Sequence, residues 1–265
     1  MANRSQVSPA LAAVGFAGLL VVLLPVIALL SRVPWSNLAN QLTSESSINA
    51  IRVSLLTSIL AAFISVLLGV PLAWYLARGP AAITKWLRPI VISPLVMPPT
   101  VAGLALLTLM GRNGLLGQFI YEQTGWAMPF TMAAVVFAGV FVGLPFLVLV
   151  VEAVFRQLPV ELEEAAQTLG ANPSKVFWRI SFPLARGGVI SGLVLAWARA
   201  LGEFGATLTF AGSLPGVTRT LPMEVYVAME VDPASAYSIS AMLVVIAITV
   251  VFLLRSNLIK AFNGK

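Results

Sequence analysis

Long apolar runs separated by short polar segments dominate the pattern of hydrophobic and polar positions along this chain. A bilayer core is about 30 Å thick, so a helix needs about 20 apolar residues to cross it. β-Barrel strands would alternate in polarity over about ten residues, which these runs do not do. The runs long enough for membrane helices are 10–31, 48–77, 90–110, 130–151, 184–206 and 238–254. They predict an all-α polytopic membrane protein with about six spans, organised as one domain over residues 1–265.

The first run could instead be a cleaved signal peptide, because Arg4 precedes it. Its apolar part exceeds the usual 7–15 residues, and no A-x-A cleavage site follows it, so a membrane helix is the better interpretation.

Lys and Arg predict the orientation, because cytoplasmic loops of membrane proteins are enriched in these residues. One side of the predicted spans holds Arg4, Arg78, Lys85, Arg88, Arg156, Lys175, Arg179, Arg186, Arg255, Lys260 and Lys265. The other side holds only Arg32, Arg112 and Arg219. The richer side is therefore predicted to be cytoplasmic, with both termini inside and segment 152–183 in the cytoplasm.

Composition narrows the function classes. The chain is 59% hydrophobic and 10% charged, whereas soluble domains carry about 25% charged residues. It contains 0 Cys and 0 His, which excludes disulfides, thiolate zinc sites and Cys or His nucleophiles. The net charge of +6 fits basic residues at a membrane face better than nucleic-acid binding. No GxxxxGK[ST] phosphate loop is present, so any ATP hydrolysis is expected on a separate chain. We expect this chain to be non-catalytic and to hold no cofactor.

Proline is frequent within the predicted spans, where it removes a backbone donor and bends a helix. Interruptions are expected at Pro25, Pro71, Pro94, Pro98, Pro99 and Pro145. The densest group, in 93–100, could break the third span into a helix that lines a pathway, because non-helical backbone at depth is tolerated there.

Segment 152–183 is long and patterned. Pro159 suits a first helical turn, and Glu161, Glu163 and Glu164 suit its positive end. Gly170 is a natural helix stop, after which Asn172 and Pro173 restart a helix. Apolar residues at helical spacing are Leu158, Leu162, Ala165, Ala166 and Leu169. An interfacial helix would carry basic residues on its polar face, so the acidic face favours a protein groove.

This segment resembles the EAA loop of ABC-importer permeases, whose pattern is E-A-A, three residues, G, nine residues, I-x-L-P. Here the match runs through Glu164, Ala165, Ala166 and Gly170 to Ile180–Pro183, with Phe182 where Leu is usual. The resemblance implies a type I importer transmembrane domain whose loop docks into a separate ATPase subunit. The coupling residues it implies are Glu161, Glu164, Ala165, Ala166, Gly170 and Pro183.

A second motif lies in and after the fifth run. The string 198–207, A-R-A-L-G-E-F-G-A-T, precedes 210–212 F-A-G and 216–222 G-V-T-R-T-L-P. It resembles oxyanion permeases, and the molybdate branch more than the sulfate branch, with tungstate not separable from molybdate. The family implies a homodimer with two cytoplasmic ABC ATPases and an extracytoplasmic oxyanion-binding protein. Candidate pathway or gate residues are Pro98, Pro99, Arg199, Gly202, Glu203, Gly205 and Thr207.

Arg199 and Glu203 are spaced i, i+4, which predicts one helix face and a charge pair in the outer half of the fifth span. The pair could be structural or could line the pathway, because charge within a span is by default a functional hint. Hydroxyls around the outer mouth, with Arg219, could replace part of a dianion's hydration; they are Thr207, Thr209, Ser213, Thr218 and Thr220.

Two other function classes are weaker. A secondary transporter or channel would usually place several acids or His at depth, whereas only Arg52, Arg199 and Glu203 lie within spans. An intramembrane enzyme lacks Cys, His and clustered Asp, which leaves few catalytic schemes. We therefore expect a multi-pass permease of the cytoplasmic (inner) membrane, with a sulfate permease as the alternative substrate assignment.

Overall fold

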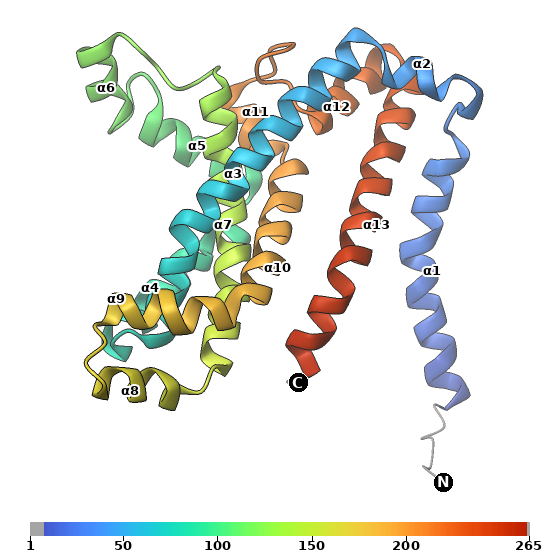
Figure 1. The fold of residues 1–265 in the computed structure, drawn as a ribbon. Coiled ribbons are helices and arrows are strands. Elements are labelled where there is room, and N and C mark those ends of the chain that lie inside the picture. The colour runs from blue at the N-terminus through green and yellow to red at the C-terminus, as the bar shows by residue number, and fades with distance from the viewer. Residues whose placement is uncertain (1–7, 264–265) are drawn as a thin grey trace.

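The computed structural model describes the backbone of residues 8–263 and the side chains of residues 8–252. Arg4 and Lys265 therefore lie outside the described residues, as do the side chains of Arg255 and Lys260. The regular elements of this part of the chain are helical, as predicted (Figure 1). The α-helices are α1 Pro9–Ser31, α2 Leu38–Leu42, α3 Glu45–Arg78, α4 Ala81–Ile92, α5 Pro99–Met110, α6 Gly117–Thr124, α7 Met132–Gln157, α8 Val160–Thr168, α9 Pro173–Val176, α10 Phe182–Leu201, α11 Gly205–Ala211, α12 Leu221–Val231 and α13 Pro233–Asn263.

Five helical segments are long and apolar enough to cross a membrane. They are α1, α3, α7, α10 with the turns before it, and α13, and they confirm five of the predicted runs. The third run, 90–110, is not one straight helix. α4 and a 3-10 turn over Ser93–Leu95 meet α5 at an angle of 112°, so the count is six if this bent pair is one span. The prolines of 93–100 explain the break, because they remove the backbone donors of residues 94, 98 and 99.

Other boundaries differ from the expectation. The fifth span ends at Leu201, and residues 202–204 separate it from α11, so 184–206 is not one helix. α7 continues to Gln157, which makes the segment between spans shorter than 152–183. Pro25, Pro71 and Pro145 do not interrupt their spans, because α1, α3 and α7 run through them.

The core is a bundle of α3, α7 and α10, whose axes approach closely at small residues (Figure 1). A Cβ at Gly139 would lie 2.9 Å from the Ala61 Cβ, and one at Gly143 would lie 3.0 Å from the Ala196 carbonyl oxygen. Hydrogen at these positions lets the backbones meet, as is usual for membrane helices. The buried apolar residues of this bundle, among them Leu147, Val148 and Val151, fill the space between the three helices.

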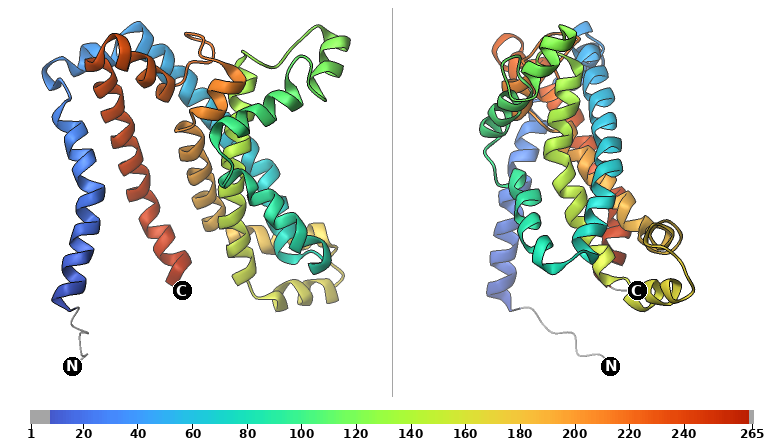
Figure 2. Two further views of the ribbon diagram at one scale, coloured as in Figure 1. Left: turned by 180° about the vertical axis from the view of Figure 1, so that it is seen from behind. Right: turned by 90° about the vertical axis from the view of Figure 1, so that its left-hand side faces the viewer.

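Two helices stand beside this bundle. α13 packs against α10, and α1 stands beside α13 at the edge of the molecule with none of its residues buried (Figure 2). The start of α1 and the end of α13 lie at the same end of the molecule as α8 and α9, while α6, α11 and α12 lie at the opposite end (Figure 1). The bundle therefore separates two ends of the molecule, one with α8 and α9 and the other with α6, α11 and α12.

Candidate functional site

α8 presents its apolar residues to the outside, the reverse of an ordinary amphipathic helix. Leu162 is 47% exposed and Leu169, directly after the helix, is 89% exposed. Glu161 and Glu164 are exposed as well, at the N-terminal half where carboxylates are favourable. No other described part of this chain covers these leucines, so the surface that they form with the neighbouring acids is suited to contact another protein.

The turn after α8 has the geometry that the sequence predicts. Gly170 has a φ of +85°, and its amide donates to the Gln167 carbonyl oxygen at 2.9 Å. The amide of the next residue donates to the Ala166 carbonyl oxygen at 3.0 Å, which completes a Schellman motif. Asn172 then caps α9 by accepting a hydrogen bond from the Lys175 amide at 2.8 Å. The predicted stop and restart of the helix are both confirmed.

α9 passes into α10 through a π-helical turn over Phe177–Ser181 rather than ending as a separate helix. Phe182, which stands where the motif usually has Leu, packs on Phe177 and Trp178 with ring centroids 6.1 and 5.4 Å away. The larger side chain therefore extends an aromatic cluster at this end. Pro183 lies in the first turn of α10, directly after the π-helical turn.

Glu163 is the residue of this segment that sequence reasoning did not single out. It is only 6% exposed, and its carboxylate accepts from Arg78 Nε at 3.0 Å and from the Ser181 hydroxyl at 2.9 Å. The sequence showed three acids at a helix start, which the helix dipole alone explains. Nothing in their spacing marked the middle one as buried, because its partners lie 85 residues before it and 18 residues after it in the chain.

At the opposite end, Glu203 lies in the break between α10 and α11 and is 3% exposed. One carboxylate oxygen is 2.5 Å from Arg199 Nη1, and the other accepts the Ala206 amide at 2.9 Å. The predicted pair with Arg199 is confirmed. The predicted continuous helix face is wrong, because α10 has ended; Glu203 instead lies just before Phe204, the N-cap of α11, and accepts the Ala206 amide of its first turn.

The two chain breaks meet at this point. A Cβ on Gly205 would lie 2.5 Å from the Pro99 Cβ, so α11 begins directly against the start of α5. A Cβ on Gly103 would lie 2.6 Å from Thr209 Cβ, which shows the same close approach one turn further on. Pro98 immediately precedes this contact as the cap residue of α5.

Of the remaining pathway candidates, Gly202 is exposed at the end of α10, whereas Thr207 is only 1% exposed. Pro98, Pro99, Arg199, Gly202, Glu203 and Gly205 thus belong to one neighbourhood of breaks and contacts. Thr207 points into the protein and offers no hydroxyl to solvent.

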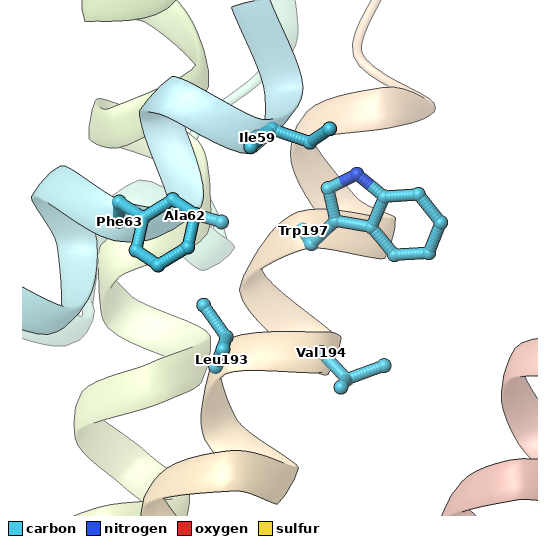
Figure 3. A pocket seen from close by; sticks show the side chains of 6 residues that line it. All are labelled: Ile59, Ala62, Phe63, Leu193, Val194 and Trp197. Carbon is cyan, nitrogen blue, oxygen red and sulfur yellow. The ribbon is translucent and has the colours of Figure 1, made fainter. Parts of the chain in front are cut away.

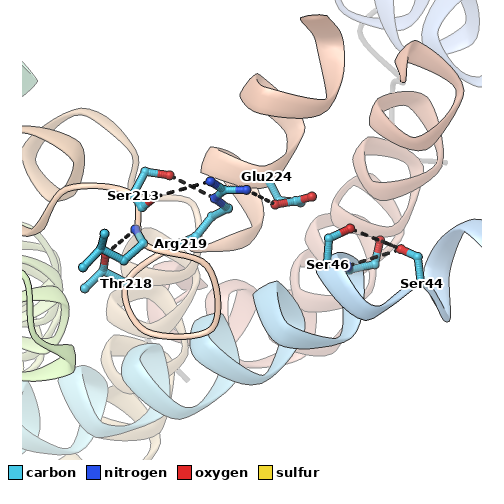
Figure 4. A network of polar contacts seen from close by, with 8 residues as sticks. Ser44, Ser46, Ser213, Thr218, Arg219 and Glu224 are labelled. Atoms are coloured by element: carbon cyan, nitrogen blue, oxygen red, sulfur yellow. Dashed lines mark hydrogen bonds and ion pairs between the residues drawn. The ribbon is translucent and has the colours of Figure 1, made fainter. Parts of the chain in front are cut away.

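The polar loop before α12 is largely occupied with its own contacts (Figure 4). Arg219 donates to the Ser213 hydroxyl at 3.2 Å and lies 3.4 Å from Glu224. Thr218 is fully buried, and its hydroxyl accepts the Leu214 amide at 2.9 Å. Arg219, Ser213 and Thr218 therefore form a folded loop rather than an open ring of free donors, whereas the buried Thr220 hydroxyl has no hydrogen-bond partner among the described residues.

An apolar hollow of about 260 Å³ lies between α3 and α10 (Figure 3). Its lining residues are Ile59, Ala62, Phe63, Leu193, Val194 and Trp197. The indole nitrogen of Trp197 donates to the Ser58 hydroxyl at 3.1 Å, so it is not free for a ligand. This chemistry does not suit an oxyanion. Among the described residues, no group of His, Cys, Asp and Glu could hold a metal ion.

Comparison with known proteins adds to this geometry. Residues 65–263 match the family described as "Binding-protein-dependent transport system inner membrane component". The chain is 47% identical over 235 residues to the "Molybdenum transport system permease protein ModB" of Mycobacterium tuberculosis, and the match covers 89% of each chain. It is 33% identical over 247 residues to the "Probable sulfate transport system permease protein cysT" of Chlorokybus atmophyticus, covering 92% of this chain and 85% of that one.

A solved structure has the same fold. A chain of the bacterial alginate ABC transporter, crystallised with an alginate-bound periplasmic protein, superposes with a TM-score of 0.70. The match covers 92% of this chain and 90% of that chain at 17% identity, so the likeness concerns the fold alone.

Gly170→Ala should loosen the turn after α8. No atom lies within 4 Å of the added Cβ, so the cost comes from the positive φ alone and should be about 1–2 kcal/mol. We expect faster amide hydrogen exchange in α8 and α9. Gly187→Ala is the matched control, because its Cβ also meets no atom within 4 Å and its backbone is helical. Equal exchange in the two variants would contradict the assigned strain.

Gly205→Val should separate α11 from α5, because its Cβ must displace Pro99, and overpacking of this kind costs about 1–3 kcal/mol. We expect a lower melting temperature of the purified protein in detergent. Gly202→Ala should have a smaller effect, since its Cβ would meet only the Ala198 carbonyl oxygen at 3.6 Å. If both variants melt at the wild-type temperature, the close contact does not stabilise the protein.

Proposed function

The chain belongs to the family of binding-protein-dependent transport system inner membrane components, and from this premise we propose that it is the permease subunit of a molybdate importer. Members of this family are multi-pass, non-catalytic transport subunits of the inner membrane that work with an ATPase and a binding protein. The 47% identity to a ModB permease over 89% of the chain carries the assignment of molybdate. The lower identity of 33% to a sulfate permease makes sulfate the second choice, and tungstate stays inseparable from molybdate.

The end that carries α8 is where we place the ATPase, and hence the cytoplasm. Support comes from the exposed apolar side chains of Leu162 and Leu169, which no other segment that the structure describes covers. The acids beside them, Glu161 and Glu164, are exposed as well. Ala165 and Ala166 allow close approach, and the rigid Gly170 turn sets the direction of the chain toward α10. With this orientation, the start of α1 and the end of α13 are cytoplasmic too (Figure 1).

The translocation pathway runs, in this proposal, past the contact between the starts of α5 and α11. Non-helical backbone within a membrane is tolerated where protein buries it or where it borders water. Pro98 and Gly202 supply such backbone, Pro99 and Gly205 begin the two helices that meet there, and the Arg199–Glu203 pair holds the break in one arrangement. A subunit of about six spans shares its pathway, so a homodimer with two ATPases inside and a binding protein outside completes the transporter.

An ATP-independent carrier is less well supported. Such carriers commonly use acids at depth that gain and lose protons. Glu203 is held by Arg199 and by the Ala206 amide, which is the arrangement of a structural or gating pair rather than of a free proton carrier.

Reconstitution tests this proposal directly. In proteoliposomes we expect molybdate uptake only when the chain, its ATPase, its binding protein and ATP are all present. Tungstate should compete with molybdate for uptake, because these two dianions are nearly the same size. Sulfate is smaller and should not compete even in about 100-fold excess. Uptake by the purified chain alone would contradict ATP coupling, and competition by sulfate at equal concentration would change the substrate assignment.

Leu169→Asp should weaken docking of the ATPase, because it places a charge in the centre of the proposed contact. We expect recovery of the ATPase with the affinity-purified permease to fall at least about fivefold, as for a substituted interface hot spot. Leu115→Asp is the matched control, since Leu115 is 80% exposed at the opposite end of the molecule. Equal ATPase recovery with both variants would remove α8 as the docking element.

A further inference from the structure

Glu163 sits on the proposed ATPase-docking helix but does not face the ATPase. It is 6% exposed, whereas Glu161 and Glu164 on the same helix are exposed. A carboxylate that leaves water is costly unless a cation and hydrogen bonds replace the water. Burial of the middle acid therefore demands specific partners, and the structure provides them on both carboxylate oxygens.

The partners of Glu163 come from two different membrane helices. Arg78, the last residue of α3, approaches one carboxylate oxygen with Nε at 3.0 Å. Ser181, at the end of the π-helical turn that leads into α10, donates its hydroxyl to the other oxygen at 2.9 Å. Arg78 also donates through Nη2 to the Leu158 carbonyl oxygen at 3.0 Å, which fixes the linker before α8. We call Arg78, Glu163 and Ser181 the α8 clamp.

The end of α3 is itself tied to the rest of the bundle. Glu152 on α7 is 4% exposed, and its carboxylate accepts from Nε of Arg88 on α4 and from Nε of Arg156, each at 2.9 Å. Both arginines also donate to the Leu76 carbonyl oxygen, at 3.4 and 3.0 Å, in the last turn of α3. Cations are favourable at this end of a helix, where carbonyl oxygens lack partners within the helix. The clamp is thus anchored on a fixed point rather than on a free helix end.

We propose that the α8 clamp positions the coupling helix so that its displacement moves α3 and α10 together. This inference rests on the proposed function, in which an ATPase displaces α8. Apart from the clamp, α8 is joined to the rest of the protein by residues 158–159, by the turn at Gly170 and by contacts with α9 and the π-helical turn, none of which reaches α3, and a push would tilt it in place. With the clamp, the same push reaches α3 through Arg78 and α10 through Ser181. α10 leads directly to Arg199 and to the break at Glu203.

Arg78, Glu163 and Ser181 are positioning residues under this proposal, because they contact neither the ATPase nor the transported ion. Loss of the clamp should therefore uncouple ATP hydrolysis from transport without preventing ATPase docking. A purely structural role would lower the yield and stability of the complex and leave the number of ions moved per ATP unchanged. This ratio separates the two roles.

The experiment uses the full complex of permease, ATPase and binding protein in proteoliposomes, with molybdate as the transported ion. In Glu163→Gln the amide oxygen still accepts from Ser181, while the amide group presents donors to Arg78 and removes the ion pair. Arg78→Lys keeps the charge but cannot reach Glu163 and the Leu158 carbonyl oxygen with one planar group. We expect each variant to retain the ATPase and to lower molybdate uptake per ATP by about tenfold.

Ser181→Ala removes one hydroxyl and is the mildest variant, so it keeps the test open if the charge variants fail to assemble; we expect a drop of about threefold in uptake per ATP. Arg78→Glu combined with Glu163→Arg restores an ion pair and should recover part of the ratio lost in each single variant. Glu122→Gln controls for the loss of a carboxylate, because Glu122 is exposed on α6 at the other end.

The outcomes are distinct. Wild-type uptake per ATP in assembled Glu163→Gln, Arg78→Lys and Ser181→Ala complexes overturns the clamp while leaving the importer assignment intact. Uptake by the wild-type complex that does not require ATP overturns the proposed function itself. A fall in the ratio with unchanged ATPase recovery, partly reversed by the exchanged pair, is the expected result.

Discussion

A carboxylate that is removed from water requires a cation within reach, and this requirement organises both ends of the molecule. Among the described side chains, the buried acids are Glu152, Glu163, Glu203 and Glu224, and each one pairs with arginine. Such pairs add little net stability, because desolvation offsets most of the attraction, but removing one partner is strongly destabilising. Their value here is geometric. Each pair fixes one element relative to another at a place where a helix ends.

The middle of the molecule follows a different constraint, which is the close approach of backbones at small residues. Gly139 and Gly143 bring α7 against α3 and α10, and Gly205 brings α11 against Pro99. Packing of this kind is strong only while both surfaces keep their shape, so the helices move as units rather than deform. Rigid helices joined at charged ends are the arrangement that a long-distance mechanical linkage needs.

Much of this architecture could be predicted from the sequence because membrane helices require long apolar runs. The runs located the spans, and the prolines of 93–100 marked the break that the structure bends by 112°. Proline alone was a poor guide elsewhere, since α3 and α7 continue through Pro71 and Pro145, where each helix loses only one donor. The turn at Gly170 was predictable because a helix stop is a local feature with a local signature.

The burial of Glu163 was not predictable, because it is not a local feature of the sequence. Its burial depends on Arg78 and Ser181, which the fold brings together from distant positions, and the same three acids would look alike on an exposed helix. The end of α10 at Leu201 was missed in a related way, because 184–206 is a predominantly apolar run and the hydrogen bond from the Ala206 amide to Glu203, which marks the new start at α11, is not visible in the residue pattern.

The loop that precedes α12 bears on where the transported ion is selected. Its one arginine is engaged by Ser213 and Glu224, its Thr218 hydroxyl accepts a backbone amide, and Thr207 nearby is buried. A site that distinguishes two tetrahedral dianions needs donors that are free and fixed around the ion, because discrimination comes from unmatched polar groups. Arg219 and Thr218 are fixed but not free, and the buried Thr220 hydroxyl, which lacks a partner among the described residues, does not by itself surround an ion. In the importer we propose, the permease therefore provides a switchable passage, and the choice between molybdate and sulfate belongs to the binding protein that delivers the ion.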